Sequence, residues 1–187
     1  MRSDAGRDRG DPRDRGETVS ETHVLNPEDA GWDLPRPFIL PVTVKTEDID
    51  DFDHANNSVY LRWADQTAWA HWEADGYTRQ NCRDLDRGMA ILRTEADYLG
   101  HCRKDEDIAC AVWIARSDGR LRAERWYQFR RVSDGETVFR AVTKLVCFQL
   151  STGRPARMVD SFARHYGKPA EDLSQAADAL DARLKRG

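Results

Sequence analysis

Acids, one histidine and two amides are crowded into residues 48–60, which read Asp-Ile-Asp-Asp-Phe-Asp-His-Ala-Asn-Asn-Ser-Val-Tyr. Side chains of these types can bring a carboxylate, an imidazole and hydrogen-bond donors to one substrate group. The carboxylate of Asp50 could act as a nucleophile or a general base, and the imidazole of His54 could orient a substrate carbonyl group or Asp50. Each residue also has a structural alternative, in which Asp50 or His54 only ties down the turn.

The segments on either side indicate how these residues are held. Residues 38–45 are rich in β-branched and apolar side chains, which predicts a strand. Apolar residues recur every three to four positions over 57–74, which predicts a helix that Asn56 or Asn57 caps. The free N–H groups and positive dipole end of this helix would face Asp50 and His54. The arrangement could polarise a carbonyl group beside a carboxylate.

A family resemblance is carried by the pattern Asp48-Ile-Asp50-x-x-x-His54-x-Asn56-Asn57-x-x-Tyr60-Leu. It resembles the signature of the hot-dog-fold acyl-CoA thioesterases, in the branch related to 4-hydroxybenzoyl-CoA thioesterase and the bacterial long-chain acyl-CoA thioesterases. The resemblance implies an α+β fold, with a curved antiparallel sheet of about five strands wrapped around the helix at 57–74. Many members have Gly where this chain has Asp53, and an Asp can adopt a positive φ there at modest cost.

The resemblance also implies an activity, the hydrolysis of an acyl-CoA or acyl-carrier-protein thioester without a metal or cofactor. Asp50 matches the catalytic carboxylate of the family, and the N–H of Asn57 or Ser58 would form the oxyanion hole. Two alternatives stay open: a non-catalytic acyl-CoA-binding module, and a hot-dog dehydratase. The chain lacks the His-x-x-x-x-x-x-Gly-Pro type element of the dehydratases after the helix start.

Further candidates lie on the helix at 57–74. Asp65 is a rival catalytic acid, because a carboxylate in the central helix does the work in another branch of the hot-dog thioesterases. Its structural alternative is a solvated surface acid, the commoner fate of such residues. Trp69 shares the polar face with Asp65 and predicts an acyl pocket or a subunit contact. Substrate contacts are also expected at the start of the helix, from Asn56, Ser58 and Tyr60.

Assembly and coenzyme binding follow from the last expected strand. Both faces of residues 137–150 become apolar, which predicts packing against another subunit. The related thioesterases form dimers and tetramers with the pantetheine arm between subunits, so a homodimer or homotetramer with a shared site is expected here. The candidate cations for the CoA phosphates are Arg103, Arg154 and Arg157.

Composition excludes several functions. The net charge of −4 gives no basic field for nucleic acid. Counted from Asp48, a calcium loop would need Gly at Asp53 and Glu at Val59, so no metal site is expected. The four cysteines are scattered, which favours a reduced, cytoplasmic protein, and no run is apolar enough to span a membrane.

The expected organisation has four parts: a disordered tail over 1–22, an extended lead-in over 23–37, the thioesterase-like domain over 38–165, and a C-terminal region over 166–187 with an amphipathic helix at 171–186. Within the domain, a polar loop is expected over 75–87. Four strands are then expected at 89–98, 108–115, 121–131 and 137–150, and Asp-Gly turns join the last three.

Overall fold

The computed structural model describes residues 25–28 and 30–185, and the tail expected over 1–22 lies outside them. The described strands are β1 (Phe38–Thr43), β2 (Gly88–Tyr98), β3 (Asp107–Ser117), β4 (Arg122–Arg131) and β5 (Thr137–Phe148). The helices are α1 (Asn57–Ala74), α2 (Arg79–Asp84), α3 (Asp160–His165) and α4 (Glu171–Leu184), with a 3-10 turn, η1, at Thr46–Asp48. None of the helices in this part of the chain is long and apolar enough to cross a membrane.

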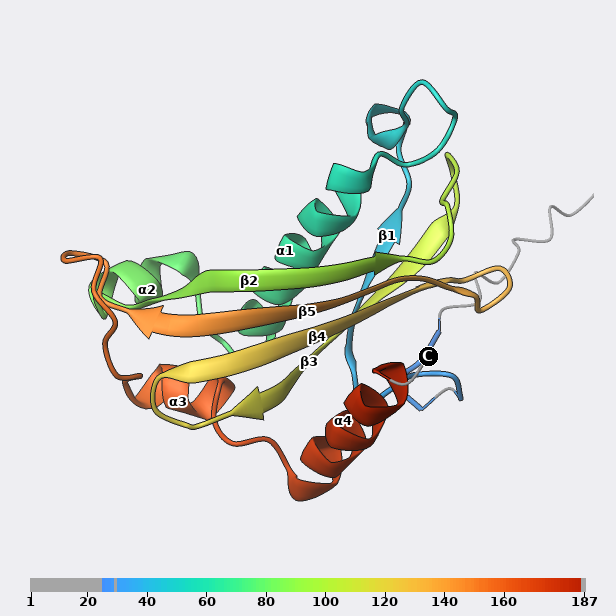
Figure 1. Cartoon of the computed structure of the whole chain (residues 1–187). Coiled ribbons are helices and arrows are strands. Elements are labelled where there is room, and N and C mark those ends of the chain that lie inside the picture. Colours follow the sequence, from blue (N-terminus) through green and yellow to red (C-terminus); the bar gives the residue numbers. More distant parts are fainter. Residues whose placement is uncertain (1–24, 29, 186–187) are drawn as a thin grey trace, which may run out of the picture.

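One antiparallel sheet of five strands, in the order β1-β3-β4-β5-β2, curves past α1 (Figure 1). The Asp-Gly turns connect β3 to β4 and β4 to β5, with φ of 68° at Gly119 and 71° at Gly135. Glycine adopts such values without the strain that a Cβ atom would add. The α+β fold, with five strands and a long central helix, is therefore confirmed.

The inner face of the sheet holds the main core. Tyr60 and Trp63 of α1 pack among Val112, Phe129 and Phe139, all almost completely buried. Burial of large aromatic side chains fixes α1 against β3 and β1, because each such side chain contributes about 2–3 kcal/mol on leaving water. This packing positions the helix N-terminus next to the turn that precedes it.

The outer face of the sheet is covered by the chain itself. Alternate residues of β3 point outward, so Trp113 packs with Trp126, Leu34 and α4 residues Ala177 and Leu180. Figure 1 shows α4, in red, on the opposite side of the sheet from α1. The C-terminal helix α4 thus covers the outer face over β3 and β4. The subunit contact expected from the apolar faces of residues 137–150 stays a prediction.

Two short helices were not predicted. The polar segment 75–87 contains α2, which begins where Thr78 and Asn81 form a reciprocal capping box. After β5, α3 brings Phe162 and Tyr166 against Trp72 near the C-terminal end of α1. Both helices close the end of the molecule that lies away from the α1 N-terminus.

Candidate active site

The turn before α1 is held by a buried acid. Asp48 is 3% exposed, accepts a hydrogen bond from the Lys45 N–H at 2.9 Å and forms an ion pair with Arg62. The Asp50 N–H donates to the His54 carbonyl oxygen at 2.9 Å, which closes the turn. Asp53 has a φ of 60°, the left-handed value that the replacement of Gly by Asp was expected to tolerate. The backbone path therefore accommodates Asp53.

Asp50 is half-buried in this turn. Its Oδ1 accepts the Phe52 N–H at 2.9 Å, and its Oδ2 makes no hydrogen bond to any other described residue. The ring of His54 lies 4.2 Å from the ring of His101, centroid to centroid, and makes no hydrogen bond to Asp50 in the described part of the chain. One carboxylate oxygen is thus available for chemistry, and the imidazole is placed beside a second imidazole.

The N-terminus of α1, which follows the turn that holds Asp50, has a backbone donor without a partner in the described chain. Asn56 is the N-cap, and its Oδ1 accepts from the Ser58 N–H at 2.9 Å and the Ser58 hydroxyl at 2.7 Å. Ser58 is therefore occupied, contrary to its expected role as an oxyanion donor. The Asn57 N–H makes no hydrogen bond to a described residue, while the Asn57 carbonyl oxygen accepts from the Tyr98 hydroxyl at 3.1 Å. Of the two donors expected, Asn57 remains.

Tyr60 lies in the core and not in a substrate pocket. It is 2% exposed, its hydroxyl donates to the Gly100 carbonyl oxygen at 3.3 Å, and the same hydroxyl accepts the Cys102 N–H at 3.1 Å. Burial, followed by the hydrogen bond to Cys102, raises the pKa of Tyr60 well above its usual range. A buried tyrosine with a satisfied hydroxyl fixes the loop after β2, so the structure gives it a positioning role.

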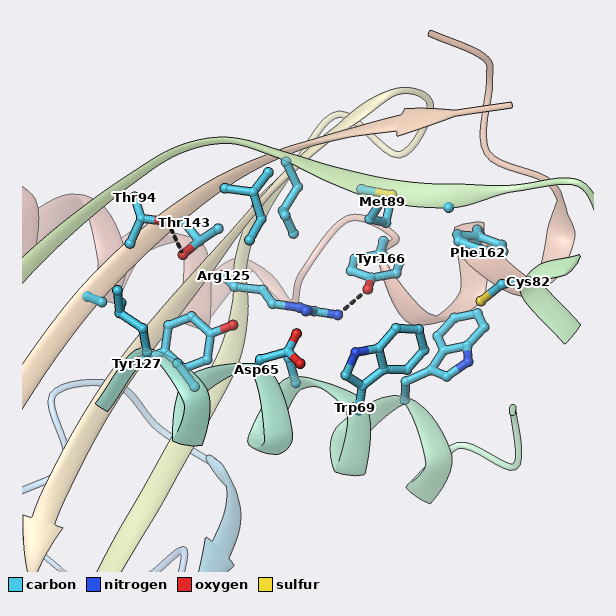
Figure 2. A pocket seen from close by; sticks show the side chains of 18 of the residues that line it. Asp65, Trp69, Cys82, Met89, Thr94, Arg125, Tyr127, Thr143, Phe162 and Tyr166 are labelled. Carbon is cyan, nitrogen blue, oxygen red and sulfur yellow. Dashed lines mark hydrogen bonds between the residues drawn. The ribbon is translucent and has the colours of Figure 1, made fainter. Parts of the chain in front are cut away.

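A cavity of about 370 Å³ runs beside α1, bounded by β2, β4, β5 and α3 (Figure 2). On the helix side it extends from Leu61, one turn after the N-terminus, to Trp72. Its aromatic walls are Trp69, Trp72, Phe148, Phe162 and Tyr166. Trp69 is further held by the guanidinium of Arg79, 4.0 Å from the ring centroid. Such walls suit an apolar acyl group.

Several polar groups enter this apolar cavity. Figure 2 shows the guanidinium of Arg125 between the Asp65 carboxylate and the rings of Tyr127 and Tyr166. Arg125 donates to the Tyr166 hydroxyl, but its buried Nε has no partner among the described residues. Burial raises the pKa of Tyr166 to about 12. Asp65 makes no hydrogen bond or ion pair within the described chain, so the carboxylate and the guanidinium face each other unpaired.

Of the residues that line this cavity, the sequence named Trp69 for an acyl pocket or a subunit contact and Asp65 as a rival catalytic acid. It missed Arg125, Tyr127 and Tyr166. The one signal for Arg125 in the sequence was a cation inside the strand expected at 121–131. It was not sufficient, because the alternation of residues along a strand does not tell which face of the sheet borders a cavity. Asp50 does not line the cavity, so the two candidate acids occupy different places: Asp50 precedes the helix N-terminus, and Asp65 lies two turns into α1.

The three candidate arginines for the CoA phosphates do not lie close together within one subunit. Arg103 follows Cys102, whose carbonyl oxygen bonds to the turn at Ala55. Arg154 and Arg157 follow β5, beyond Phe148, which pairs with Gly88 at the opposite end of β2. The eleven residues of β2 separate these ends by roughly 33 Å. Among the described residues, no three His, Cys, Asp or Glu side chains gather as metal ligands would.

Comparison with known proteins shows which family the chain resembles. The model of the thioesterase-like superfamily matches residues 44–165. A 1,4-dihydroxy-2-naphthoyl-CoA thioesterase from Synechocystis superposes with a TM-score of 0.64 at 14% identity, over 70% of this chain and 95% of that one. A hypothetical protein from Staphylococcus aureus, solved in complex with CoA, gives 0.64 at 18% identity, over 73% and 89%. No curated protein sequence matches this chain.

Another structure, a probable thioesterase from Escherichia coli, gives a TM-score of 0.59 at 16% identity, over 74% of this chain and 98% of that one. At such identities the superpositions establish the fold, and the family model establishes membership. The resemblance carried by residues 48–60, and with it the expectation of a thioester hydrolase at the level of the family, is confirmed. The chain belongs to the thioesterase-like superfamily.

Proposed function

We propose that this protein hydrolyses an acyl-CoA, or acyl-carrier-protein, thioester. The observation that carries the proposal is an aromatic-walled cavity beginning one turn past the N-terminus of α1, where the Asn57 N–H has no partner in the described chain and the Asp50 carboxylate lies in the preceding turn. A thioester places an apolar acyl chain and a polarisable carbonyl group side by side, which fits this arrangement. The CoA bound to the Staphylococcus aureus structure supports CoA as the thiol.

In the proposed reaction, the substrate carbonyl oxygen accepts a hydrogen bond from the Asn57 N–H at the positive end of α1. This donor stabilises the negative oxygen of the tetrahedral intermediate, a contribution of roughly 3–4 kcal/mol in other hydrolases. Asp50, in its charged form, attacks the carbonyl carbon or takes the proton of an attacking water. The carbon–sulfur bond then breaks, and the leaving thiolate takes a proton from the protonated Asp50 on the general-base route or from water on the nucleophilic route. On the nucleophilic route a water molecule then hydrolyses the acyl anhydride of Asp50, which releases the acid and regenerates the carboxylate.

The acyl chain lies in the cavity beside α1 in this proposal. The stretch from Leu61 to Trp72 spans about 16 Å along the helix axis, so it can hold a long chain or an aromatic group. Asp65 lies within the cavity, where it meets the acyl group and not the thioester carbonyl. Asp50 therefore remains the preferred catalytic carboxylate, and Asp65 is the alternative that mutagenesis must exclude.

The free edge of β2 supports a homodimer. Among the described strands, β2 pairs with β5 alone, and its side chains Ile91 and Leu92 are 64% and 53% exposed. Exposed apolar edge strands are normally paired or covered. Antiparallel pairing of two β2 edges would bring Arg154 and Arg157 of the partner subunit toward Asp50, where CoA phosphates could meet them. Because α4 covers the outer face over β3 and β4, the dimer is favoured over a tetramer joined through that part of the sheet.

Thiol release from a panel of acyl-CoAs tests the function directly. The expected result is turnover with at least one acyl group, assayed at neutral pH with the purified full chain. Calorimetric titration of the same acyl-CoAs into the protein provides the control. Tight binding without thiol release would identify a binding module, and hydration or dehydration of the acyl chain would identify a dehydratase.

A further inference from the structure

A second cavity, of about 290 Å³, lies beside His71 in the last turns of α1, the end of the helix away from Asp50. Its apolar floor includes Phe38 of β1 and Val112 of β3, and its rim is formed by the segment between α3 and α4. It shares no lining residue with the acyl cavity. The two cavities are therefore separate sites. They are adjacent, because His165 lines the second cavity and the next residue, Tyr166, lines the acyl cavity.

Every charged side chain that lines this second cavity is basic: Arg36, Arg164 and Lys168. Arg36 forms an exposed ion pair with Asp172, at 2.7 Å between Nη2 and Oδ2. Arg164 donates from Nε to the Tyr77 hydroxyl at 3.0 Å, which leaves both of its terminal nitrogens without a partner in the described chain. Lys168 likewise has no partner there. Because the full chain carries a net charge of −4, this local excess of positive charge is not a reflection of the whole surface.

Two histidines form the inner wall. His71 stacks on Phe38, with ring centroids 4.9 Å apart, and meets the ring of His165 edge-on at 4.7 Å. The side chain of His165 is fully buried, and its Nδ1 donates to Oδ2 of Asp75 at 2.6 Å. Nδ1 of His71 and Nε2 of His165 are buried and have no partner among the described residues. A buried ring nitrogen without a hydrogen bond lowers the stability of the fold. Its presence here points to a ligand or a water molecule that binds at this wall.

We propose that this cavity binds a phosphate group. A tetrahedral anion can accept hydrogen bonds at once from the free guanidinium nitrogens of Arg164, the ammonium of Lys168 and the outer side of Arg36. The ring of His71 adds a donor when it is protonated. The cavity is polar at its rim and large enough for a phosphate and its waters, and none of its lining residues in the described chain is acidic. The carboxylates that contact its lining are already paired, Asp172 with Arg36 and Asp75 with His165.

The phosphate has two potential sources with the same chemistry. One is free inorganic phosphate, and the other is the 3′-phosphate of a CoA molecule. Inorganic phosphate carries no nucleoside, so it probes the cavity alone. A comparison of CoA with 3′-dephospho-CoA then distinguishes the sources, because only the first has the phosphate monoester.

Anion binding should be visible at His71. Burial, followed by His165 and Arg125, lowers the pKa of His71 to about 4, and Asp75 opposes this shift. The other charged groups that face it are the cavity cations Arg36, Arg164 and Lys168. A bound phosphate adds negative charge beside the ring and favours its protonated form, so the pKa of His71 should rise. Five histidines in the chain make the imidazole signals assignable by NMR.

The test is calorimetric titration of inorganic phosphate into the full chain at constant ionic strength. Wild type is expected to bind with a Kd below about 1 mM. The double variant Arg164→Gln/Lys168→Gln removes two exposed cations and should lose at least about tenfold in affinity. Lys104→Gln, at an exposed lysine outside the cavity, is the matched control and should bind as wild type does.

Equal affinity in the double variant, or an equal loss in Lys104→Gln, would overturn the proposal, as would an unchanged His71 pKa at saturating phosphate. If CoA displaces phosphate and 3′-dephospho-CoA does not, the coenzyme is the source. If neither displaces it, the site takes free phosphate. Both results support a phosphate site, and neither depends on thioester hydrolysis, so the proposed function can fail while this site stands.

Discussion

Arg125 places a positive charge in the otherwise largely apolar acyl cavity. Its guanidinium enters an apolar space, its Nε is unpaired in the described chain, and it donates to the Tyr166 hydroxyl. A buried guanidinium whose Nε lacks a partner in the described chain disfavours a purely apolar acyl chain, because covering it leaves that N–H without a hydrogen bond. We therefore expect Arg125 to affect which acyl group is accepted and not the bond that breaks.

The replacement Arg125→Met should raise kcat/KM for unsubstituted acyl-CoAs relative to acyl-CoAs of equal length that carry an oxygen on the chain. A change of about tenfold in this ratio corresponds to one hydrogen bond to a charged group. Steady-state kinetics on matched substrate pairs measure it. Tyr127→Phe serves as a control that keeps the charge, and an unchanged ratio in Arg125→Met would show that Arg125 is only structural.

The lowered pKa of His71 predicts that the stability of the protein depends on pH. Its folded pKa of about 4 lies below the usual value near 6.5, so between these values the unfolded chain binds a proton that the folded chain does not. Stability is then fully present above about pH 6.5 and is lost as the pH falls toward 4. Between pH 7.5 and 5, the protonation of His71 in the unfolded chain should lower the free energy of unfolding by about 2 kcal/mol.

Urea unfolding at both pH values, in buffer without phosphate, measures this loss. His71→Gln should show a smaller decrease between pH 7.5 and 5 than wild type, because other titrating groups are common to both proteins. An identical decrease in the two proteins would mean that His71 titrates normally in the folded state.

At the scale of elements, α4 stabilises the sheet from outside. Leu180 is 6% exposed in the cluster with Trp113 and Trp126, whereas Leu184, on the same helix, is 48% exposed. Leu180→Ala should lower the free energy of unfolding by about 2–3 kcal/mol. Leu184→Ala, the same change at an exposed position, should cost less than about 0.5 kcal/mol. Chemical denaturation of both variants checks this, and equal losses would contradict the packing.

Elements with strong periodicity were predictable from the sequence, and assembled sites were not. The helix at 57–74 and the two Asp-Gly turns follow from local patterns, and α1 has those bounds. The short helices α2 and α3 were missed because each is six residues long and depends on tertiary contacts, such as Phe162 on Trp72. The acyl cavity joins Asp65, Arg125 and Tyr166 from three distant segments, which no single stretch reveals.

At the scale of the whole molecule, the free β2 edge makes assembly testable. Leu92→Asp places a charge on the exposed edge and should convert the expected homodimer to a monomer with lost activity. Leu184→Asp, an exposed leucine on α4, should leave the assembly unchanged. Light scattering with parallel assays measures both, and a fully active wild-type monomer at assay concentration would contradict a shared site.

The central claim is thioester hydrolysis with Asp50 as the catalytic carboxylate, and the most direct test is acyl-CoA turnover in wild type, Asp50→Asn and Asp65→Asn. Asp50→Asn should lower kcat by at least about 100-fold with the Tm nearly unchanged, because the amide oxygen can still accept the Phe52 N–H. Asp65→Asn should retain turnover. Wild-type turnover in Asp50→Asn together with an inactive Asp65→Asn would contradict the account and move catalysis to the α1 carboxylate.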